Sequence, residues 1–143
     1  MLMSQKKNIT TKLMAKTMNK EFVTYEQALA LKELGFDEPC LAGYDLNKSM
    51  YVSYVSIEDS QYYSSFELKA PLKQQVFRWF REKHNLLGYV DSDTQEYGIE
   101  YSYHINDLIK GHTHFQLYID SYEQAEQACI DELIKLSKQQ DNG

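Results

Sequence analysis

Apolar residues recur at helical spacing in three segments of the chain, and two of these segments begin with the same helix-starting pattern. Thr24-Tyr25-Glu26-Gln27 and Ser121-Tyr122-Glu123-Gln124 each place a hydroxyl side chain three residues before a glutamine, the spacing of a capping box. The first helix is predicted to span about ten residues and to stop at Gly35, since glycine readily adopts the left-handed conformation. The helix that begins with the other copy of this pattern is predicted to run from Ser121 through Leu136.

The remaining helical segment follows Pro71, which suits the first position of a helix because its missing N–H needs no partner there. The segment ends at Asn85-Leu86-Leu87-Gly88. Its apolar residues share one helical stripe, which comprises Leu72, Val76, Phe77 and Phe80. We therefore expect a helix that begins at Pro71 and lies at the centre of the core.

Short apolar and aromatic runs elsewhere in the chain are typical of strands. Leu41–Tyr44 and Met50–Ser56 flank the polar turn Asp45–Ser49 and predict a β-hairpin. Residues 57–69 are polar with scattered aromatics, and we assign them to a loop that could hold a short strand. Residues 87–119 predict a three-stranded antiparallel meander, with strands Leu87–Val90, Tyr97–Ile105 and His114–Ile119.

The order of these elements, α-β-β-α-β-β-β-α, predicts an α+β fold with an antiparallel sheet of about five strands. The helices are expected to pack mainly on one face of that sheet, with the middle and last helices covering it. Residues 1–20 are expected to form a flexible basic N-terminal extension, 21–138 a single α+β domain, and 139–143 a frayed C-terminal tail.

Charge is distributed unevenly along the chain, whose net charge is −6. Five lysines precede the first acidic residue, Glu21, and the ten basic residues that follow face twenty-one acidic ones, a net charge of −11. An acidic domain repels phosphate, so nucleic acid is disfavoured as its partner. An acidic mimic of nucleic acid is a remote alternative.

Several kinds of site and location are disfavoured by the sequence. No apolar run is long enough for a membrane span, and the first twenty residues lack a secretory apolar region, so we expect a cytoplasmic protein with no membrane partner. Cys40 and Cys129 lack metal or redox spacing and suit two reduced, buried thiols, with one disulfide as the alternative. The six glycines are scattered and form no phosphate loop. We expect no cofactor.

Aromatic residues are unusually frequent, with twelve tyrosines, six phenylalanines and one tryptophan. A domain of this size cannot bury them all, so some are expected to face water or a partner. The arginines around Trp79 could bind a nucleotide or phosphorylated ligand with it, although we favour a packed indole and arginines that pair with acids. The candidate binding residues are Tyr51, Tyr54, Tyr62, Tyr63, Arg78, Trp79 and Arg81.

Three histidines form the candidate metal site. His112 and His114 are spaced for one strand face, and a hairpin centred on Ile109 would place His104 opposite His114. Three imidazoles with a nearby carboxylate suit zinc. The alternative, which we favour, is that these are ordinary strand histidines, because the spacing matches no specific zinc motif. The acidic pair Asp91/Asp93 is assigned to a solvated turn.

Four segments carry a shared pattern, namely Tyr25-Glu26-Gln27-Ala28, Leu34-Gly35-Phe36-Asp37, Gln74–His84 and Tyr122-Glu123-Gln124-Ala125. Together they resemble a group of small uncharacterised proteins encoded by phages, prophages and other mobile elements of anaerobic gut bacteria. The resemblance covers about residues 18–138, and its motifs mark starts and stops of helices. It implies that residues 1–17 are an extension, and it assigns no activity to any residue.

The sequence therefore favours a non-enzymatic binding or accessory protein of a phage or mobile element. It would act through contact with a protein or a small ligand, and a homodimer is one form that this contact could take. The alternative is a metal-dependent enzyme that uses His104, His112 and His114.

Overall fold

The computed structural model describes residues 19–52 and 67–142. Contacts divide the chain into two compact units. The first unit comprises Met1–Lys32 and Phe36–Leu72, and the second comprises Glu33–Gly35 and Lys73–Gly143. The broad α+β class expected from the sequence is confirmed.

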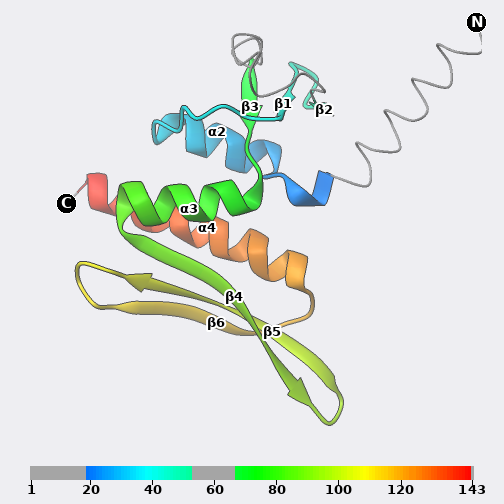
Figure 1. Cartoon of the computed structure of the whole chain (residues 1–143), viewed down its shortest axis with the longest axis vertical. Coiled ribbons are helices and arrows are strands. Elements are labelled where there is room, and N and C mark those ends of the chain that lie inside the picture. Colours follow the sequence, from blue (N-terminus) through cyan, green and yellow to red (C-terminus); the bar gives the residue numbers. More distant parts are fainter. Residues whose placement is uncertain (1–18, 53–66, 143) are drawn as a thin grey trace, which may run out of the picture. The chain divides into compact units, whose positions relative to one another are not determined.

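The described residues of the first unit form a short 3-10 helix, one α-helix and a small antiparallel sheet (Figure 1). The sheet has the order β2-β1-β3. Ala42 at its centre pairs with Val52 on one side and with Ala70 on the other. The elements are η1 (Asn19–Glu21), α2 (Tyr25–Glu33), β1 (Ala42–Tyr44), β2 (Met50–Val52) and β3 (Leu68–Ala70).

Both ends of α2 follow from local sequence. The Gln27 amide donates to Thr24 Oγ1 at 3.2 Å, and the Thr24 amide donates to Gln27 Oε1 at 3.1 Å, so the predicted capping box is confirmed. Gly35 has a φ of 92° after the helix, and the amide of buried Phe36 donates to the Leu31 carbonyl at 2.9 Å. The predicted stop is therefore confirmed.

The predicted hairpin of the first unit is confirmed as far as Val52, with Tyr44 opposite Met50, and residues 53–56 of its second predicted strand lie outside the described residues. Its turn is held by Asp45, whose Oδ1 accepts from the amides of Asn47 at 2.9 Å and Ser49 at 3.0 Å. The Tyr44 hydroxyl donates to the Val23 carbonyl at 2.7 Å, which ties the hairpin to the chain before α2.

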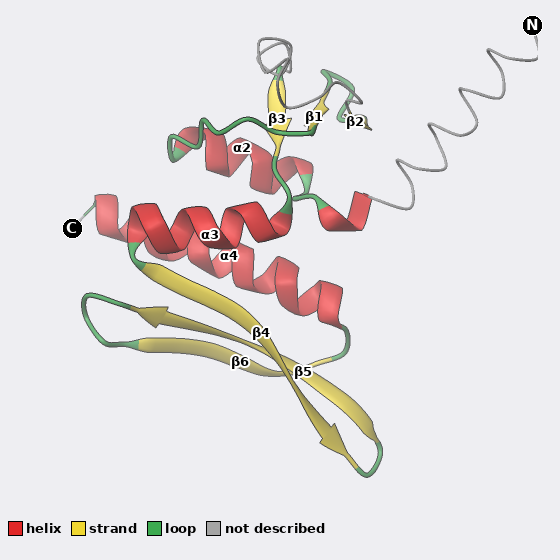
Figure 2. Cartoon of the chain, in the orientation of Figure 1, coloured by secondary structure: helices red, strands yellow, loops and turns green. Residues whose placement is uncertain are grey.

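The second unit is a helix-covered meander. Its sheet is antiparallel with the order β4-β5-β6, and Figures 1 and 2 show both helices on the same side of it. The elements are α3 (Lys73–His84), β4 (Leu86–Gln95), β5 (Gly98–Asp107), β6 (Thr113–Ile119) and α4 (Tyr122–Asp141).

The prediction of one sheet of about five strands is wrong, because the described strands form two sheets of three. β3 lies in the stretch assigned to a loop with a short strand, and it completes the sheet of the first hairpin by pairing with β1. The meander β4-β5-β6 forms a separate sheet. The strands divide into two sheets because β3 pairs with β1, which is distant in sequence, and not with the meander that follows it.

α3 begins two residues later than predicted, so the assignment of Pro71 to its first position is wrong. The Pro71 carbonyl accepts from the Val23 amide at 3.1 Å, and Leu72 forms a β-bridge with Phe22. These contacts hold Pro71 and Leu72 in extended pairing with the chain before α2, so the helix starts at Lys73. It ends at His84, and Asn85 has a φ of 56° before β4.

The core of the second unit lies between the sheet and the two helices. A Cβ at Gly88 of β4 would lie 2.9 Å from Leu133 Cδ1 and 3.1 Å from Cys129 Sγ, so only glycine allows α4 this close. Phe80, predicted at the centre of the core, is fully buried. The other buried apolar residues of this layer include Val76, Leu86, Ile105, Ile130 and Leu133.

α4 starts where the sequence predicts and extends further. The Gln124 amide donates to Ser121 Oγ at 3.2 Å, as expected of an N-cap. The helix continues to Asp141, and Gln140 Nε2 donates to the His84 carbonyl at 3.3 Å. Residues 139–141 thus belong to the helix, not to the expected tail. Among the residues described, no helix combines the length and apolar character that crossing a membrane requires.

Candidate functional site

The sheet of the second unit has one face against the helices and one face turned away from them. Successive residues of a strand point to opposite faces, so Gly88 and buried Ile105 mark the helix-facing side. Tyr89 and His104, each one position away, lie on the other side. We call this side, opposite α3 and α4, the outer face.

Three rings form a continuous row across the outer face. Tyr89 of β4 lies opposite His104 of β5, which lies opposite Phe115 of β6. The Tyr89 and His104 rings are stacked with centroids 5.2 Å apart, and the His104 and Phe115 rings with centroids 6.1 Å apart. Tyr89 is 41% exposed and Phe115 is 60% exposed. We call these three residues the aromatic row.

The histidine at the centre of the row is held by its neighbours. His104 Nε2 lies 3.2 Å from Ser102 Oγ, two residues along the same strand and on the same face. The imidazole is therefore positioned by one hydrogen bond and two flanking rings. The row offers a partner a flat aromatic surface with a polar ring at its centre.

A hollow lies beyond the row, towards the turn between β4 and β5. Asp93 and Glu100 lie directly opposite each other there. Gln95 Nε2 donates to Asp93 at 2.5 Å, and the Tyr97 hydroxyl donates to Glu100, a hydrogen bond that raises the pKa of Tyr97. The residues that line the hollow are Asp93, Gln95, Tyr97, Glu100, Tyr101, Ser102, Leu117 and Tyr118.

β6 is irregular beside this hollow. Its register with β5 shifts between the pairs at Tyr101 and Tyr103. Tyr118 has a φ of 60°, a left-handed conformation that is strained for a residue with a large side chain, and it is 74% exposed. Bulges often occur where a strand re-aims a side chain at a functional site.

The histidines do not meet as predicted. The β5–β6 register places His114 opposite Ile105 and Phe115 opposite His104, so the prediction that His104 lies opposite His114 is wrong by one residue. Because neighbouring residues alternate in facing, His104 and His114 lie on opposite faces of the sheet. His112 is exposed in the loop, where its carbonyl accepts from the Asp107 amide at 2.8 Å.

The turn chemistry explains this register. Asp107 Oδ1 accepts from the amides of Ile109 at 3.0 Å and Lys110 at 2.8 Å, and Gly111 has a φ of 73°. These bonds fix the loop between Asn106 and Thr113, which are paired. In the part of the chain that the structure describes, no three His, Cys, Asp or Glu side chains are grouped closely enough to hold a metal ion.

The candidate group on α3 is arranged differently from a stacking site. Trp79 is only 5% exposed, and its ring meets those of Phe80 and His84 edge-on at 5.0 and 4.8 Å. Arg78 and Arg81 pair with Glu82, at 3.3 and 3.9 Å. The indole face that a nucleotide would need is therefore covered.

The tyrosines proposed as a contact surface lie in or near the first hairpin. Tyr51 of β2 lies opposite Gly43 and is 40% exposed. Tyr54, Tyr62 and Tyr63 lie outside the described residues.

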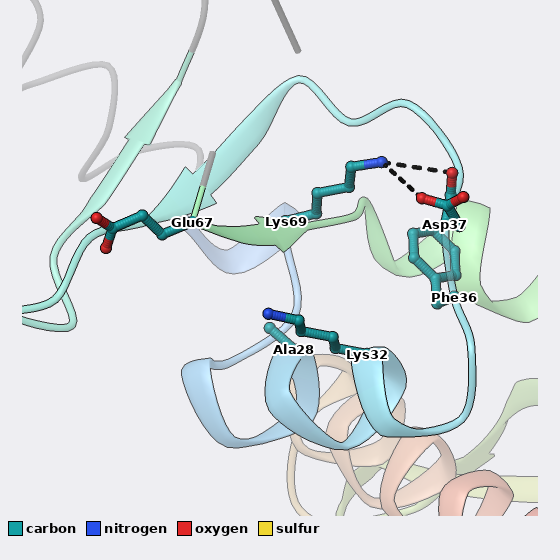
Figure 3. Close-up of a pocket in the computed structure, with 6 residues that line it drawn as sticks. All are labelled: Ala28, Lys32, Phe36, Asp37, Glu67 and Lys69. Carbon is teal, nitrogen blue, oxygen red and sulfur yellow. Dashed lines mark hydrogen bonds and ion pairs between the residues drawn. The ribbon is translucent and has the colours of Figure 1, made fainter. Parts of the chain in front are cut away.

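The first unit also contains a small pocket, shown in Figure 3. Lys69 Nζ lies 3.3 Å from Asp37 Oδ1 and pairs with it, so part of its charge is already compensated. The pocket volume is about 190 Å³, below the roughly 300–1,000 Å³ typical of ligand pockets. The outer face of the second unit, which carries the aromatic row, is the stronger candidate for a surface that another protein contacts. The pocket is lined by Ala28, Lys32, Phe36, Asp37, Glu67 and Lys69.

Tyr89 and Phe115 are not among the site residues predicted from the sequence, although both fall in predicted strands. Each stands one position from an inward-facing residue, so alternation alone assigns it to the outer face. The missing information was the register, which brings the two rings to either side of His104.

Comparison of the chain with protein-family models, with curated proteins and with solved structures finds no match. The resemblance to proteins of phages and mobile elements therefore stays a prediction.

Proposed function

We propose that this chain is a binding protein that contacts a protein partner through the outer face of its second sheet. The observation that carries the proposal is the aromatic row, in which Tyr89 and Phe115 flank His104. Tyrosine and phenylalanine are enriched where proteins meet, and a large exposed apolar patch is uncommon on a surface with no partner.

The row is not needed to build the core of the second unit. The helix-facing side already buries Ile105 and Leu86 beneath the helices, whereas Tyr89 and Phe115 remain 41% and 60% exposed. Exposed stacked rings contribute little to folding compared with buried side chains. They supply a rigid apolar contact at low entropic cost, which is what a protein interface uses.

The row also has the dimensions of an interface centre. It crosses three neighbouring strands, which lie roughly 4.8 Å apart in a sheet, so its outer rings are separated by about 10 Å. A flat surface of this size suits a side chain or strand of another protein better than a small enclosed ligand. The proposed setting, the cytoplasm of a cell that carries a phage or mobile element, rests on the sequence alone.

Photo-crosslinking tests this proposal. The residue p-benzoylphenylalanine in place of Phe115 keeps an aromatic ring in the row, and in the producing cells it should link to a specific protein on irradiation. The matched control carries the same residue in place of Tyr122, which is 43% exposed at the start of α4. Adducts that are the same at both positions, or absent at 115, would overturn the proposal.

A further inference from the structure

The hairpin of β4 and β5 extends beyond the part of the sheet that the helices cover. Figure 2 shows the turn between these strands lying away from both α3 and α4. Every residue from Asp91 to Glu100 is exposed or half-buried. Pairing of β5 with β6 begins at Tyr101, which lies opposite Ile119, so the earlier residues of β5 pair with β4 alone. We call residues 91–102 the arm.

The arm carries negative charge that no basic residue within it balances. It contains four acidic residues and no lysine or arginine. Asp93 and Glu100 are directly opposite each other, an arrangement that is destabilising for like charges. Their hydrogen bonds come from the neutral side chains of Gln95 and Tyr97. No ion pair in the described ranges involves a carboxylate of the arm.

The same arm exposes apolar surface. Tyr97 is 75% exposed and Ile99 is 55% exposed, and across the hollow Tyr118 is 74% exposed. A two-stranded hairpin without a packed face is marginally stable in water. The arm therefore combines exposed rings, opposed carboxylates and a hairpin with no packed face. A partner with basic and apolar side chains would cover the rings, neutralise the carboxylates and support the hairpin.

We propose that the arm selects a basic partner, namely a protein segment in which lysine or arginine alternates with apolar residues. The inference rests on the proposed function, because the hollow continues the outer face beyond the aromatic row. Cationic head groups would pair with Asp93 and Glu100, and their stems or guanidinium planes would lie on the rings of Tyr97 and Tyr118.

Charge also separates this partner from other occupants. A second copy of the chain brings the same net charge of −6 and the same acidic arm, so pairing of arm with arm adds repulsion. Nucleic acid presents phosphate to the carboxylates and is repelled in the same way. A basic protein segment is the occupant that the charges favour.

The test measures binding of a fluorescein-labelled eight-residue peptide of alternating arginine and leucine by fluorescence anisotropy. The wild-type chain should bind it and should bind the glutamine-for-arginine version at least about tenfold more weakly. The affinity for the arginine peptide should fall as salt rises from about 0.05 to about 0.5 M. No binding, or equal binding of the two peptides, would overturn the inference.

Matched variants localise the binding. D93N/E100Q removes two charges from the arm, and E123Q/D141N removes two exposed charges from α4. The arm variant should lose at least about tenfold in affinity and the control less than about twofold. An equal loss in both variants would show attraction by net charge alone and would contradict the inference.

The two proposals fail separately. If crosslinking at position 115 is specific but D93N/E100Q binds the peptide as the wild type does, only the choice of a basic partner is wrong. If the arm variant loses the peptide while crosslinks at 115 and 122 are the same, the charge selection holds and the aromatic row is not the interface. Circular dichroism should show that both double variants keep the wild-type fold.

Discussion

Lys73 and Glu126 form a buried ion pair between the first turn of α3 and α4. Their side chains are 3% and 10% exposed, Lys73 Nζ lies 3.8 Å from Glu126 Oε1, and Gln74 Nε2 donates to the same carboxylate at 3.3 Å. Removing one partner from such a pair leaves a buried charge without compensation. The pair therefore fixes how the start of α3 sits on α4.

Glu126→Leu should lower the free energy of unfolding by about 3–5 kcal/mol, because the Lys73 ammonium would stay buried without its carboxylate. The double variant Lys73→Met/Glu126→Leu should recover most of that loss, since it replaces both charges by apolar groups. Urea denaturation of the wild type, the single variant and the double variant measures this. Equal stability of single and double variants would show that the pair is not buried as described.

Gly88→Ala should cost about 1–3 kcal/mol of stability, because the new methyl group would meet Leu133 Cδ1 at 2.9 Å and Cys129 Sγ at 3.1 Å. Leu133→Val removes the Cδ atoms, so in that background the cost of Gly88→Ala should be smaller than in the wild type. A double-mutant cycle from thermal or urea unfolding gives the coupling. Costs that add without coupling would place α4 further from β4.

Cys40 and Cys129 should resist alkylation in the native protein. Both are buried, and burial raises the pKa of each thiol to about 12. Iodoacetamide at neutral pH should modify them only after urea unfolds the chain, as mass spectrometry would show. Rapid modification of either thiol in the folded protein would mean that the site opens to solvent.

The same thiols should make the protein less stable at alkaline pH. Their folded-state pKa values lie above the ordinary value of 9.0, so the unfolded chain ionises first as pH rises. The stabilisation is complete below pH 9.0 and is lost between 9.0 and about 12. In Cys129→Ala, the fall of unfolding free energy across this range should be shallower than in the wild type. An identical slope would rule out a contribution from Cys129.

Asp107 should set the position of Phe115 beside His104. Its carboxylate accepts from the Lys110 and Ile109 amides, and these bonds lower its pKa. Asp107→Ala should therefore loosen β6 and raise its hydrogen-exchange rates, whereas Asp107→Asn keeps an acceptor oxygen and should change them less. If hydrogen exchange in β6 is as slow in both variants as in the wild type, the Asp107 turn does not determine the register.

Local signals in the sequence predicted the helix starts well. Thr24 and Ser121 cap their helices through residues only three positions away, so the relevant contacts are visible in the sequence. Pro71 was assigned to the wrong position because its carbonyl pairs with Val23, a contact that no local pattern contains. The division into two sheets was also not predicted because it depends on a contact between distant segments, namely the pairing of β3 with β1.

The candidate site was harder to predict than the fold class. A shift of one residue in the β5–β6 register moves His114 to the opposite face from His104 and brings Phe115 to the outer face instead. The side-chain bonds of Asp107 that set this register depend on the geometry of the loop. The aromatic row therefore emerges only when all three strands are aligned.

Capture of a partner by variants of the aromatic row tests directly whether the outer face is the binding surface. Tyr89→Ser and Phe115→Ser remove exposed rings, so each should change the free energy of unfolding by less than about 1.5 kcal/mol. Tyr122→Ser is the control, since Tyr122 has a similar exposed fraction and lies on α4. Each immobilised protein is incubated with extract of the producing cells, and bound proteins are quantified by mass spectrometry. We predict a protein that the wild type and Tyr122→Ser capture and that both row variants lose, whereas undiminished capture by the row variants would contradict the proposed function.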